Sequence, residues 1–306
     1  MGLPPTERTS ENLLLAGARQ ARLPRNPLLA TLVLLGGVVV ALLGSVVGAL
    51  ASATVLLAPV PLGVRSALSI AGAFAGIWFG LFLWVRLVER RPFRSAGFVA
   101  RQPLLRYLRG VAIGIAMFTA VVGLMVLAGA ASVDGVRLDG GTIATLAAAA
   151  IGYSVQGSAE EALLRGWLLP VAAVRFGLVA ALIVQAVLFT LLHGLNPGIT
   201  LIAIVNLALV SLFLGVWALR EESIWAVMGW HAAWNWTQST VFGIAVSGLP
   251  PSESLLQVKV VGPDWLTGGI FGAESTILAS LVLTAGLLTA LLLRRPAAST
   301  ESPLDR

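Results

Sequence analysis

The sequence lacks cysteine entirely, contains only two histidines and is poor in charged residues. The absence of cysteine excludes disulfide bonds, thiol nucleophiles and thiolate metal sites. Charged residues make up 11% of the 306 residues, whereas a soluble domain carries about 25%. Hydrophobic residues make up 58%. This balance excludes an ordinary soluble protein and indicates that most of the chain lies in lipid.

Long apolar runs recur along the chain, and a helix needs about 20 apolar residues to cross a bilayer. We therefore predict an all-α, polytopic membrane protein with about eight transmembrane helices in a single domain, residues 27–295. Pro170 is expected to kink the fourth helix. No internal repeat and no separate soluble domain is visible. The predicted spans are 27–57, 66–88, 110–131, 142–174, 178–193, 199–219, 224–246 and 274–293, with loops at 133–141 and 247–272.

Residues 1–26 are polar and include a short amphipathic helix at Leu13–Ala21. They do not resemble a signal peptide, because the apolar run that follows is too long. The net charge of +6 does not indicate nucleic acid as a partner, because the basic residues fall in short loops between apolar runs. Sixteen lie on one side of the predicted membrane and three on the other. By the positive-inside rule, we expect a multi-pass plasma-membrane protein with both termini, 1–26 and 296–306, in the cytoplasm. The three basic residues on the other, non-cytoplasmic side are Arg65, Arg137 and Lys259.

Two adjacent carboxylates and an arginine interrupt the fourth apolar run, at Glu160, Glu161 and Arg165. An ionisable group within a membrane span costs about 2.5–3.5 kcal/mol on insertion scales, so such groups usually have a function. Glu161 and Arg165 are four residues apart and can pair on one helix face. We interpret that pair as fixing helix packing, with Glu161 also able to assist Glu160. Glu160 points to another face and is expected to have no local partner.

Both histidines, His193 and His231, lie in predicted spans beside a neighbour at helical spacing, Phe189 and Asn235 respectively. Glu160 lies about 15 residues before the turn at 175–177, and His193 about 16 residues after it. If the fourth and fifth helices form an antiparallel hairpin, both groups lie about 23 Å from that turn, at 1.5 Å per residue. We therefore expect an active site buried between the fourth, fifth and seventh helices.

The residue types indicate hydrolysis of an amide without a covalent nucleophile. A carboxylate in an apolar pocket, Glu160, should have a raised pKa and act as general base or acid. An imidazole beside it, His193, can orient or deprotonate a water, while His231 and Asn235 can stabilise an oxyanion. The same three groups, Glu160, His193 and His231, could instead hold a divalent metal such as zinc. No His-Glu-x-x-His helix is present, which excludes a zincin but not a metal.

The remaining polar and aromatic residues in the spans allow simpler interpretations. Asn206 either forms hydrogen bonds between helices or touches the site, with neither alternative favoured. Asn196 is interpreted as a turn residue before Pro197. Trp234 and Trp236 are either packing and interface residues or walls of the cavity.

Three motifs occur in order: Glu160-Glu161-Ala-Leu-Leu-Arg165, Phe189-Thr-Leu-Leu-His193 and His231-Ala-Ala-Trp-Asn235. In these the chain resembles the CPBP family of intramembrane proteases, which includes type II CAAX prenyl endopeptidases and bacteriocin-processing or abortive-infection homologues. The resemblance implies cleavage of a peptide bond in a membrane-associated protein or peptide, within or beside the lipid bilayer. It implies that the first Glu and first His activate water and that the second His and the Asn stabilise the oxyanion. Arg165 and Phe189 would support them, with or without a metal.

Two other functions remain as alternatives. A non-catalytic scaffold or immunity protein could use the same fold, although it would have no need of an unpaired Glu160. A transporter with a proton relay would predict repeated halves, which the sequence does not show. The CAAX enzymes are taken to open toward the cytosol, whereas the arginine count places His193 near the non-cytoplasmic end of its span. The sequence therefore does not determine how deep in the membrane the site lies.

Overall fold

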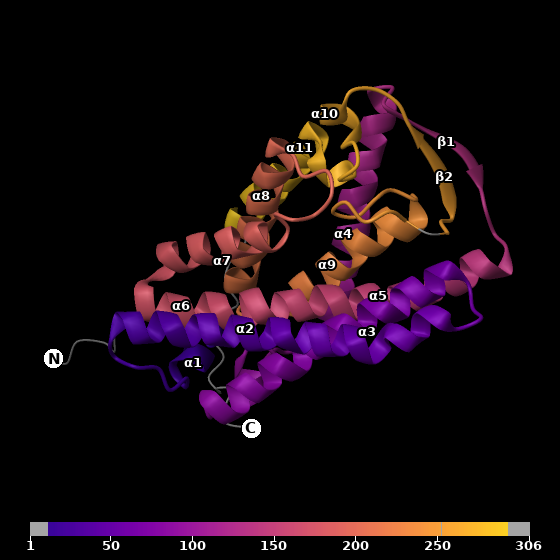
Figure 1. The fold of residues 1–306 in the computed structure, drawn as a ribbon. Coiled ribbons are helices and arrows are strands. Elements are labelled where there is room, and N and C mark those ends of the chain that lie inside the picture. Colours follow the sequence, from indigo (N-terminus) through magenta and orange to yellow (C-terminus); the bar gives the residue numbers. More distant parts are fainter. Residues whose placement is uncertain (1–11, 252, 293–306) are drawn as a thin grey trace.

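The computed structural model describes residues 12–251 and 253–292, and it is mostly helical (Figure 1). The predicted tail at 296–306 and residues 1–11 of the predicted polar start lie outside the described residues. The expected amphipathic helix is confirmed as α1, Leu13–Arg19, which begins where the side chain of Asn12 accepts the backbone N–H of Leu14. The long helices are α2 (Pro27–Ser52), α3 (Leu62–Leu83), α4 (Pro103–Leu127), α5 (Gly140–Glu161), α6 (Leu169–Phe176), α7 (Leu178–Leu192), α8 (Leu201–Glu221), α9 (Trp225–Trp236) and α11 (Ile277–Leu292). The short ones are η1 (Ala53–Leu57), η2 (Trp84–Val88), η3 (Phe93–Ser95), η4 (Ala162–Leu168), η5 (Thr237–Val241), α10 (Asp264–Thr267) and η6 (Ala273–Ser275).

Within the described part of the chain, four stretches are long and apolar enough to cross a membrane. Helices α7 and α11 are apolar but shorter. The helical membrane protein expected from the sequence is thus confirmed, while the count of eight spans stays a prediction. The four stretches are Pro27–Leu57, Leu62–Val88, Pro103–Leu127 and Leu201–Glu221.

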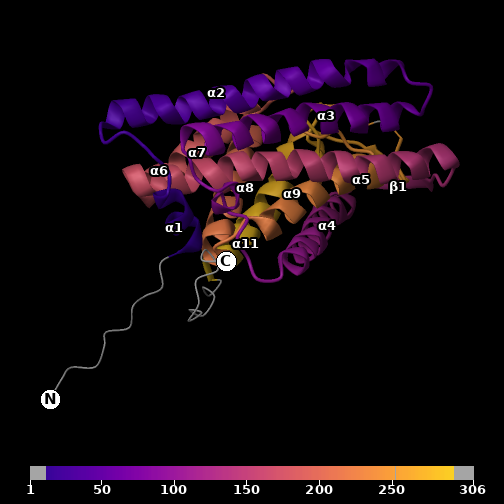
Figure 2. The same ribbon diagram turned by 90° about the horizontal axis from the view of Figure 1, so that it is seen from below.

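The long helices pack in a continuous series. Helices α2, α3 and the α5–α6 rod run side by side as one layer (Figure 2). Helix α5 also packs on α9, and α9 packs on α4. On the other side α6 contacts α7, α7 contacts α8, and α8 contacts α11. Helix α5 therefore lies between the α2–α3 pair and the remaining helices, so that it can present side chains to an interior space.

The predicted fourth helix continues without interruption from α5 through η4 into α6. Proline at position 170 has no N–H to donate and collides with the carbonyl one turn earlier. The chain accommodates it with a π turn over Ala162–Leu168, which widens the helix instead of ending it. Gly177, with φ +89°, then reverses the chain into α7. The expected hairpin of the fourth and fifth helices is confirmed as the contact of α6 with α7.

The prediction of an all-α chain with plain loops at 133–141 and 247–272 is wrong in one respect. Strands β1 (Ala131–Val136) and β2 (Leu256–Val260) pair as an antiparallel sheet, with an irregularity between Val133 and Gly135. Alternating residues in Leu-Gln-Val-Lys-Val indicate a strand, but five residues are too short to identify from sequence, and their partner is distant along the chain. We call the end of the molecule that carries this two-stranded sheet the hairpin end; it lies opposite the turn between α6 and α7 (Figure 1).

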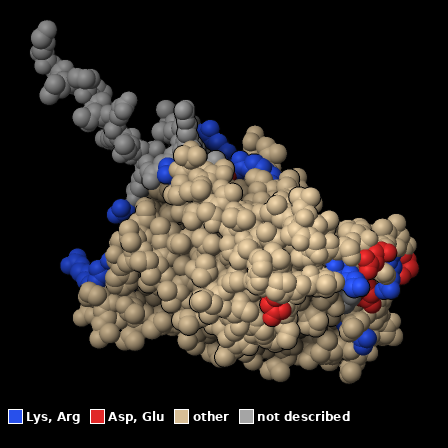
Figure 3. Space-filling model, turned by 90° about the horizontal axis from the view of Figure 1, so that it is seen from above, with Lys and Arg blue, Asp and Glu red and all other residues tan. Residues whose placement is uncertain are grey.

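Charged residues gather toward the two ends of the molecule, leaving an almost uncharged band between them (Figure 3). The hairpin end carries Asp139, whose side chain accepts the backbone N–H of Thr142 at 2.8 Å and caps α5. That hydrogen bond lowers the pKa of Asp139 below its ordinary value. The opposite end, which we call the termini end, holds α1 and the loop between α3 and α4 with most of the arginines. The uncharged band fits the hydrocarbon core of a membrane.

Helices α2 and α3 approach each other through glycines spaced four residues apart. A Cβ built on Gly44 would lie 2.2 Å from the carbonyl oxygen of Gly76, and a Cβ built on Gly76 would lie 1.9 Å from that of Gly44. Gly48 faces the carbonyl of Gly72 in the same way, at 2.2 Å. Small residues at this spacing let helices pack closely in lipid, where the hydrophobic effect does not drive one helix to associate with another. This interface fixes α3 against α5.

We expect Gly76→Ala to lower the thermal unfolding midpoint of the purified protein in detergent by several degrees, because the added methyl group forces the two helices apart. Overpacking of this kind typically costs about 1–3 kcal/mol. The matched control is Gly123→Ala in α4, where a Cβ meets nothing within 4 Å. Alanine should leave stability there unchanged or slightly raised, since it favours helix more than glycine. An equal effect of the two substitutions would contradict the close packing.

Candidate active site

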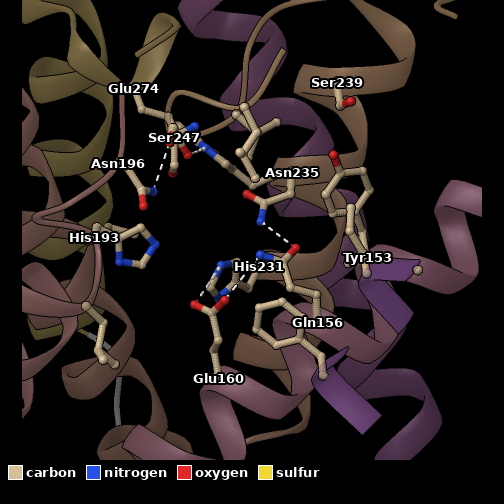
Figure 4. Close-up of a pocket in the computed structure, with 18 of the residues that line it drawn as sticks. Tyr153, Gln156, Glu160, His193, Asn196, His231, Asn235, Ser239, Ser247 and Glu274 are labelled. Atoms are coloured by element: carbon tan, nitrogen blue, oxygen red, sulfur yellow. Dashed lines mark hydrogen bonds and ion pairs between the residues drawn. The ribbon is translucent and has the colours of Figure 1, made fainter. Parts of the chain in front are cut away.

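A cavity of about 610 Å³ lies within the helical core and is lined by side chains from α3, α5, α7, α8 and α9 and from the loop after η5 (Figure 4). Glu160, His193, His231 and Asn235 all line it. These four side chains come from the predicted fourth, fifth and seventh helices, and α3 and α8 also contribute to the walls; that this space is the active site stays a prediction. Side chains more than 70 residues apart in sequence thus share one interior space.

The second carboxylate of the pair lies behind the cavity wall. Glu161 Oε1 accepts a hydrogen bond from Arg165 Nη1 at 2.8 Å, and both side chains are fully buried. The guanidinium also donates to the hydroxyl of Ser211 on α8 and lies 5.0 Å from the ring centre of Phe189 on α7. The predicted Glu161–Arg165 ion pair is confirmed, and it joins α5, the π turn, α7 and α8.

His231 lies between the two carboxylates. Its Nδ1 is 2.8 Å from Glu161 Oε1, and its Nε2 is 3.8 Å from Glu160 Oε2. Because a carboxylate accepts hydrogen bonds, Nδ1 carries the proton and donates it to Glu161. In the neutral ring, Nε2 then presents a lone pair toward Glu160 and the cavity. Glu161 therefore does more than fix helix packing, since it also orients His231, the imidazole in contact with Glu160.

The expectation that Glu160 has no local partner is wrong. Gln156, one turn earlier on α5, donates from Nε2 to Glu160 Oε1 at 3.2 Å. Gln156 Oε1 in turn accepts a hydrogen bond from Asn235 Nδ2 at 3.1 Å (Figure 4). The sequence signal was present, because glutamine four residues before Glu160 lies on the same helix face. Gln156 ties one carboxylate oxygen down and leaves Oε2 facing His231.

His193 faces the same cavity from the end of α7 (Figure 4). Its Nδ1 is 2.8 Å from the carbonyl oxygen of Phe189, one turn earlier, so Nδ1 carries the proton. The two rings also lie 4.5 Å apart, centre to centre. Nε2 is thereby left for the cavity. His231, not His193, is the imidazole in contact with Glu160.

Another part of the cavity wall is built from the loop after η5 and from η6, just before α11. Glu274 Oε2 accepts hydrogen bonds from the backbone N–H and the hydroxyl of Ser247, both at 2.8 Å. Asn196 Nδ2 donates to the carbonyl of Ser247 at 2.9 Å, so Asn196 is more than a turn residue. The sequence indicated no role for Glu274, because it is the first residue of its predicted span and matches no motif.

The two open sequence alternatives are resolved by contacts. Asn206 donates to the carbonyls of Glu274 and Thr276, so it forms hydrogen bonds between helices while also lining the cavity. Trp234 is one of the cavity walls. Trp236 instead donates to the carbonyl of Leu146 and packs on α5.

The candidate metal ligands Glu160, His193 and His231 do not converge as a bound metal requires. Among residues 12–251 and 253–292, no three His, Asp or Glu side chains are grouped so that they could hold a metal ion. Each histidine donates its Nδ1 N–H, His231 to Glu161 and His193 to the Phe189 carbonyl, an arrangement that is also compatible with metal binding through Nε2. The spacing of the three side chains, as they lie, is what does not fit a divalent metal.

Comparison with known proteins gives one finding. Residues 142–237 match the family model described as type II CAAX prenyl endopeptidase Rce1-like. The matched segment spans all three sequence motifs and the helices α5 to α9. Comparison with curated proteins and with solved structures gave no match.

We expect Arg165→Met to destabilise the protein strongly, because it leaves the carboxylate of Glu161 buried without its cation. Removing one partner of a buried ion pair costs about 3–5 kcal/mol. The double variant Glu161→Gln with Arg165→Met should recover part of that loss, since neither partner is then charged. Thermal unfolding midpoints in detergent of the two single variants and the double variant measure the coupling. Strictly additive losses would contradict the pairing.

Proposed function

From the CPBP-type protease segment at residues 142–237, we propose that this protein is an intramembrane endopeptidase. Its substrate would be a membrane-associated protein or peptide, cleaved by CAAX-type proteolysis. The observation that carries the proposal is the position of Glu160 at the cavity, with Oε2 3.8 Å from His231 Nε2. A water molecule in the cavity can donate one proton to Glu160 Oε2 and the other to His231 Nε2, because both atoms accept hydrogen bonds when the ring is neutral.

In the proposed reaction, Glu160 is the general base. Gln156 holds Oε1, so the proton of the attacking water passes to Oε2 while the water oxygen bonds to the substrate carbonyl carbon. The carbonyl π pair moves to its oxygen and gives a tetrahedral oxyanion. Collapse of that intermediate breaks the C–N bond, and the protonated Glu160 returns the proton to the leaving amine. Water is consumed, and no covalent enzyme intermediate forms.

The contacts favour other roles for the two histidines than those that the sequence suggested. His231, tied to Glu161 through Nδ1, orients the water beside Glu160. Asn235 Nδ2 has one N–H engaged by Gln156 and a second free to donate to the oxyanion. His193 Nε2, whose partner nitrogen donates to a carbonyl, lies across the cavity, where it would contact the substrate.

We expect Glu160→Gln to lower the rate of peptide cleavage by about 10²–10⁴-fold, the usual contribution of a general base, without loss of folding. The measurement is turnover of a peptide library by the purified protein in detergent, together with its thermal unfolding midpoint. Glu253→Gln is the matched control. Glu253 accepts the backbone N–H of Gly63 at 2.8 Å, which a glutamine oxygen can also do, and it does not line the cavity.

Cleavage that survives Glu160→Gln would reject Glu160 as base. If the wild type cleaves nothing, and the wild type and the Glu160→Gln variant both still bind a partner protein, the scaffold alternative is favoured instead.

We expect Gln156→Leu to act on kcat rather than KM. Leucine has similar volume but cannot hold Glu160 or Asn235, and a misplacement of about 1 Å in an active site can cost about 10²-fold. A fall of about 10-fold to 10²-fold in kcat, with KM unchanged, is the expected result of steady-state kinetics. A rise in KM alone would show that Gln156 only shapes the cavity.

A further inference from the structure

The two carboxylate oxygens of Glu161 have different contacts. Oε1 accepts hydrogen bonds from both Arg165 Nη1 and His231 Nδ1, each at 2.8 Å. Oε2 is buried and has no hydrogen-bond partner among residues 12–251 and 253–292, and the same is true of Arg165 Nε. Arginine and carboxylate frequently pair through two parallel hydrogen bonds, which would engage a second atom on each side. A contact outside the pair therefore holds it in a form with one hydrogen bond.

Ser211 of α8 provides that contact. Its hydroxyl accepts a hydrogen bond from Arg165 Nη2 at 3.0 Å, so this nitrogen is not available to the second oxygen of Glu161. The ring of Phe189 lies on another side of the guanidinium, 5.0 Å from its carbon. A rotation that brought the guanidinium onto both oxygens of Glu161 would break the hydrogen bond to Ser211.

Gln185 of α7 determines which way the hydroxyl of Ser211 points. The amide Nε2 of Gln185 donates to the backbone carbonyls of Ser211 and Leu182, at 3.1 and 3.2 Å, so its Oε1 faces the hydroxyl. Ser211 Oγ donates its single proton to that Oε1 at 2.9 Å. The lone pairs of the hydroxyl are thereby left for the cation of Arg165. Gln185 and Ser211 are both fully buried, so bulk water does not compete for these bonds.

Gly215 leaves the space that the amide of Gln185 occupies. It lies one turn after Ser211 on α8, and a Cβ built on it would be 3.2 Å from Gln185 Nε2. The hydrogen bonds run in one direction, from the guanidinium to Ser211 and from Ser211 to Gln185, and bonds aligned in this way strengthen one another. Neither Gln185 nor Ser211 lines the cavity, so they reach it through Arg165 and Glu161.

We propose that Ser211 and Gln185 are positioning residues for the site. They hold Arg165 to one oxygen of Glu161, and that oxygen accepts the Nδ1 proton of His231. The ring then keeps its unprotonated Nε2 toward the cavity. Without the two positioning residues the guanidinium pairs with both oxygens of Glu161, and the hydrogen bond that selects the tautomer of His231 weakens. The effect on cleavage rests on the proposed function, whereas the effect on the ring does not.

The tautomer of His231 is directly measurable, because the chain contains only two histidines. Nitrogen NMR of the purified protein in detergent, with isotope-labelled histidine, distinguishes protonated from unprotonated ring nitrogens at alkaline pH, where the rings are neutral. A His193→Gln variant assigns the two sets of signals. His193 is the internal reference, since its Nδ1 donates to the carbonyl of Phe189 and not to Glu161.

We expect Ser211→Ala and Gln185→Met each to lower the ratio of the Nδ1–H to the Nε2–H tautomer at His231 about fivefold, the net effect of one hydrogen bond. The ratio at His193 should not change. Thermal unfolding midpoints show which variants fold, and either variant alone is sufficient for the test. Thr190→Val is the matched control, because it removes a hydroxyl that donates within its own helix. An unchanged ratio at His231, or an equal shift at both histidines, would overturn the proposal.

A second background tests whether the effect passes through the ion pair. The double variant Glu161→Gln with Arg165→Met has no guanidinium to hold, so adding Ser211→Ala to it should leave the ratio at His231 unchanged. A further fall of the ratio in that background would show that Ser211 acts by another route, and it would overturn the proposal.

Cleavage kinetics separate this proposal from the proposed function. We expect Ser211→Ala to lower kcat about tenfold with KM unchanged, a smaller loss than a full misplacement of about 1 Å causes. A shifted tautomer at His231 together with the kcat of the wild type would overturn the positioning role. A wild type that shows the expected tautomer but cleaves no peptide would reject the proposed function alone.

Discussion

The structure depends on keeping two carboxylates in an environment that is otherwise apolar. A buried charge is tolerated only when it is paired and hydrogen-bonded. Glu161 meets that condition with Arg165 on one side and His231 on the other, both at 2.8 Å. The carboxylate of Glu160 has other contacts, since Gln156 donates a hydrogen bond to Oε1 while Oε2 faces the cavity and His231. One carboxylate is thus neutralised and positions its neighbours, while the adjacent one is left available for chemistry.

The packing of the helices follows from this division. The Glu161–Arg165 pair reaches α8 through Ser211, and Phe189 of α7 lies against the guanidinium. Close glycine contacts between α2 and α3 bring the latter onto α5 without bulky side chains at the interface. The polar groups therefore specify which helices meet around the cavity, and the small residues determine how closely the outer pair approaches.

The sequence predicted those parts of the fold and the site that depend on local spacing. Apolar runs identified the helices, and four-residue spacing identified the Glu161–Arg165 pair and the face shared by His231 and Asn235. Gln156 could have been found by the same rule, because it lies one turn before Glu160. The pairing of β1 with β2 and the approach of Glu274 to Ser247 depend on residues that are distant in sequence, and no local pattern specifies them. The choice of His231 over His193 as the contact of Glu160 depends on how α9 packs on α5, which spacing along one helix cannot express.

The π turn at Ala162–Leu168 has a consequence for the phase of the helix that contains the glutamate pair. An α-helix advances by about 100° per residue, so one additional residue in a turn rotates everything after it by that amount relative to everything before it. The segment ahead of the turn points Gln156 and Glu160 into the cavity, while the segment after it, through Ala172, is buried against other helices. A single rod therefore presents two differently directed faces, one toward the cavity and one toward the packed helices. An insertion or deletion of one residue between them would turn one face by about 100° relative to the other, so the length of this segment is constrained as strictly as its composition.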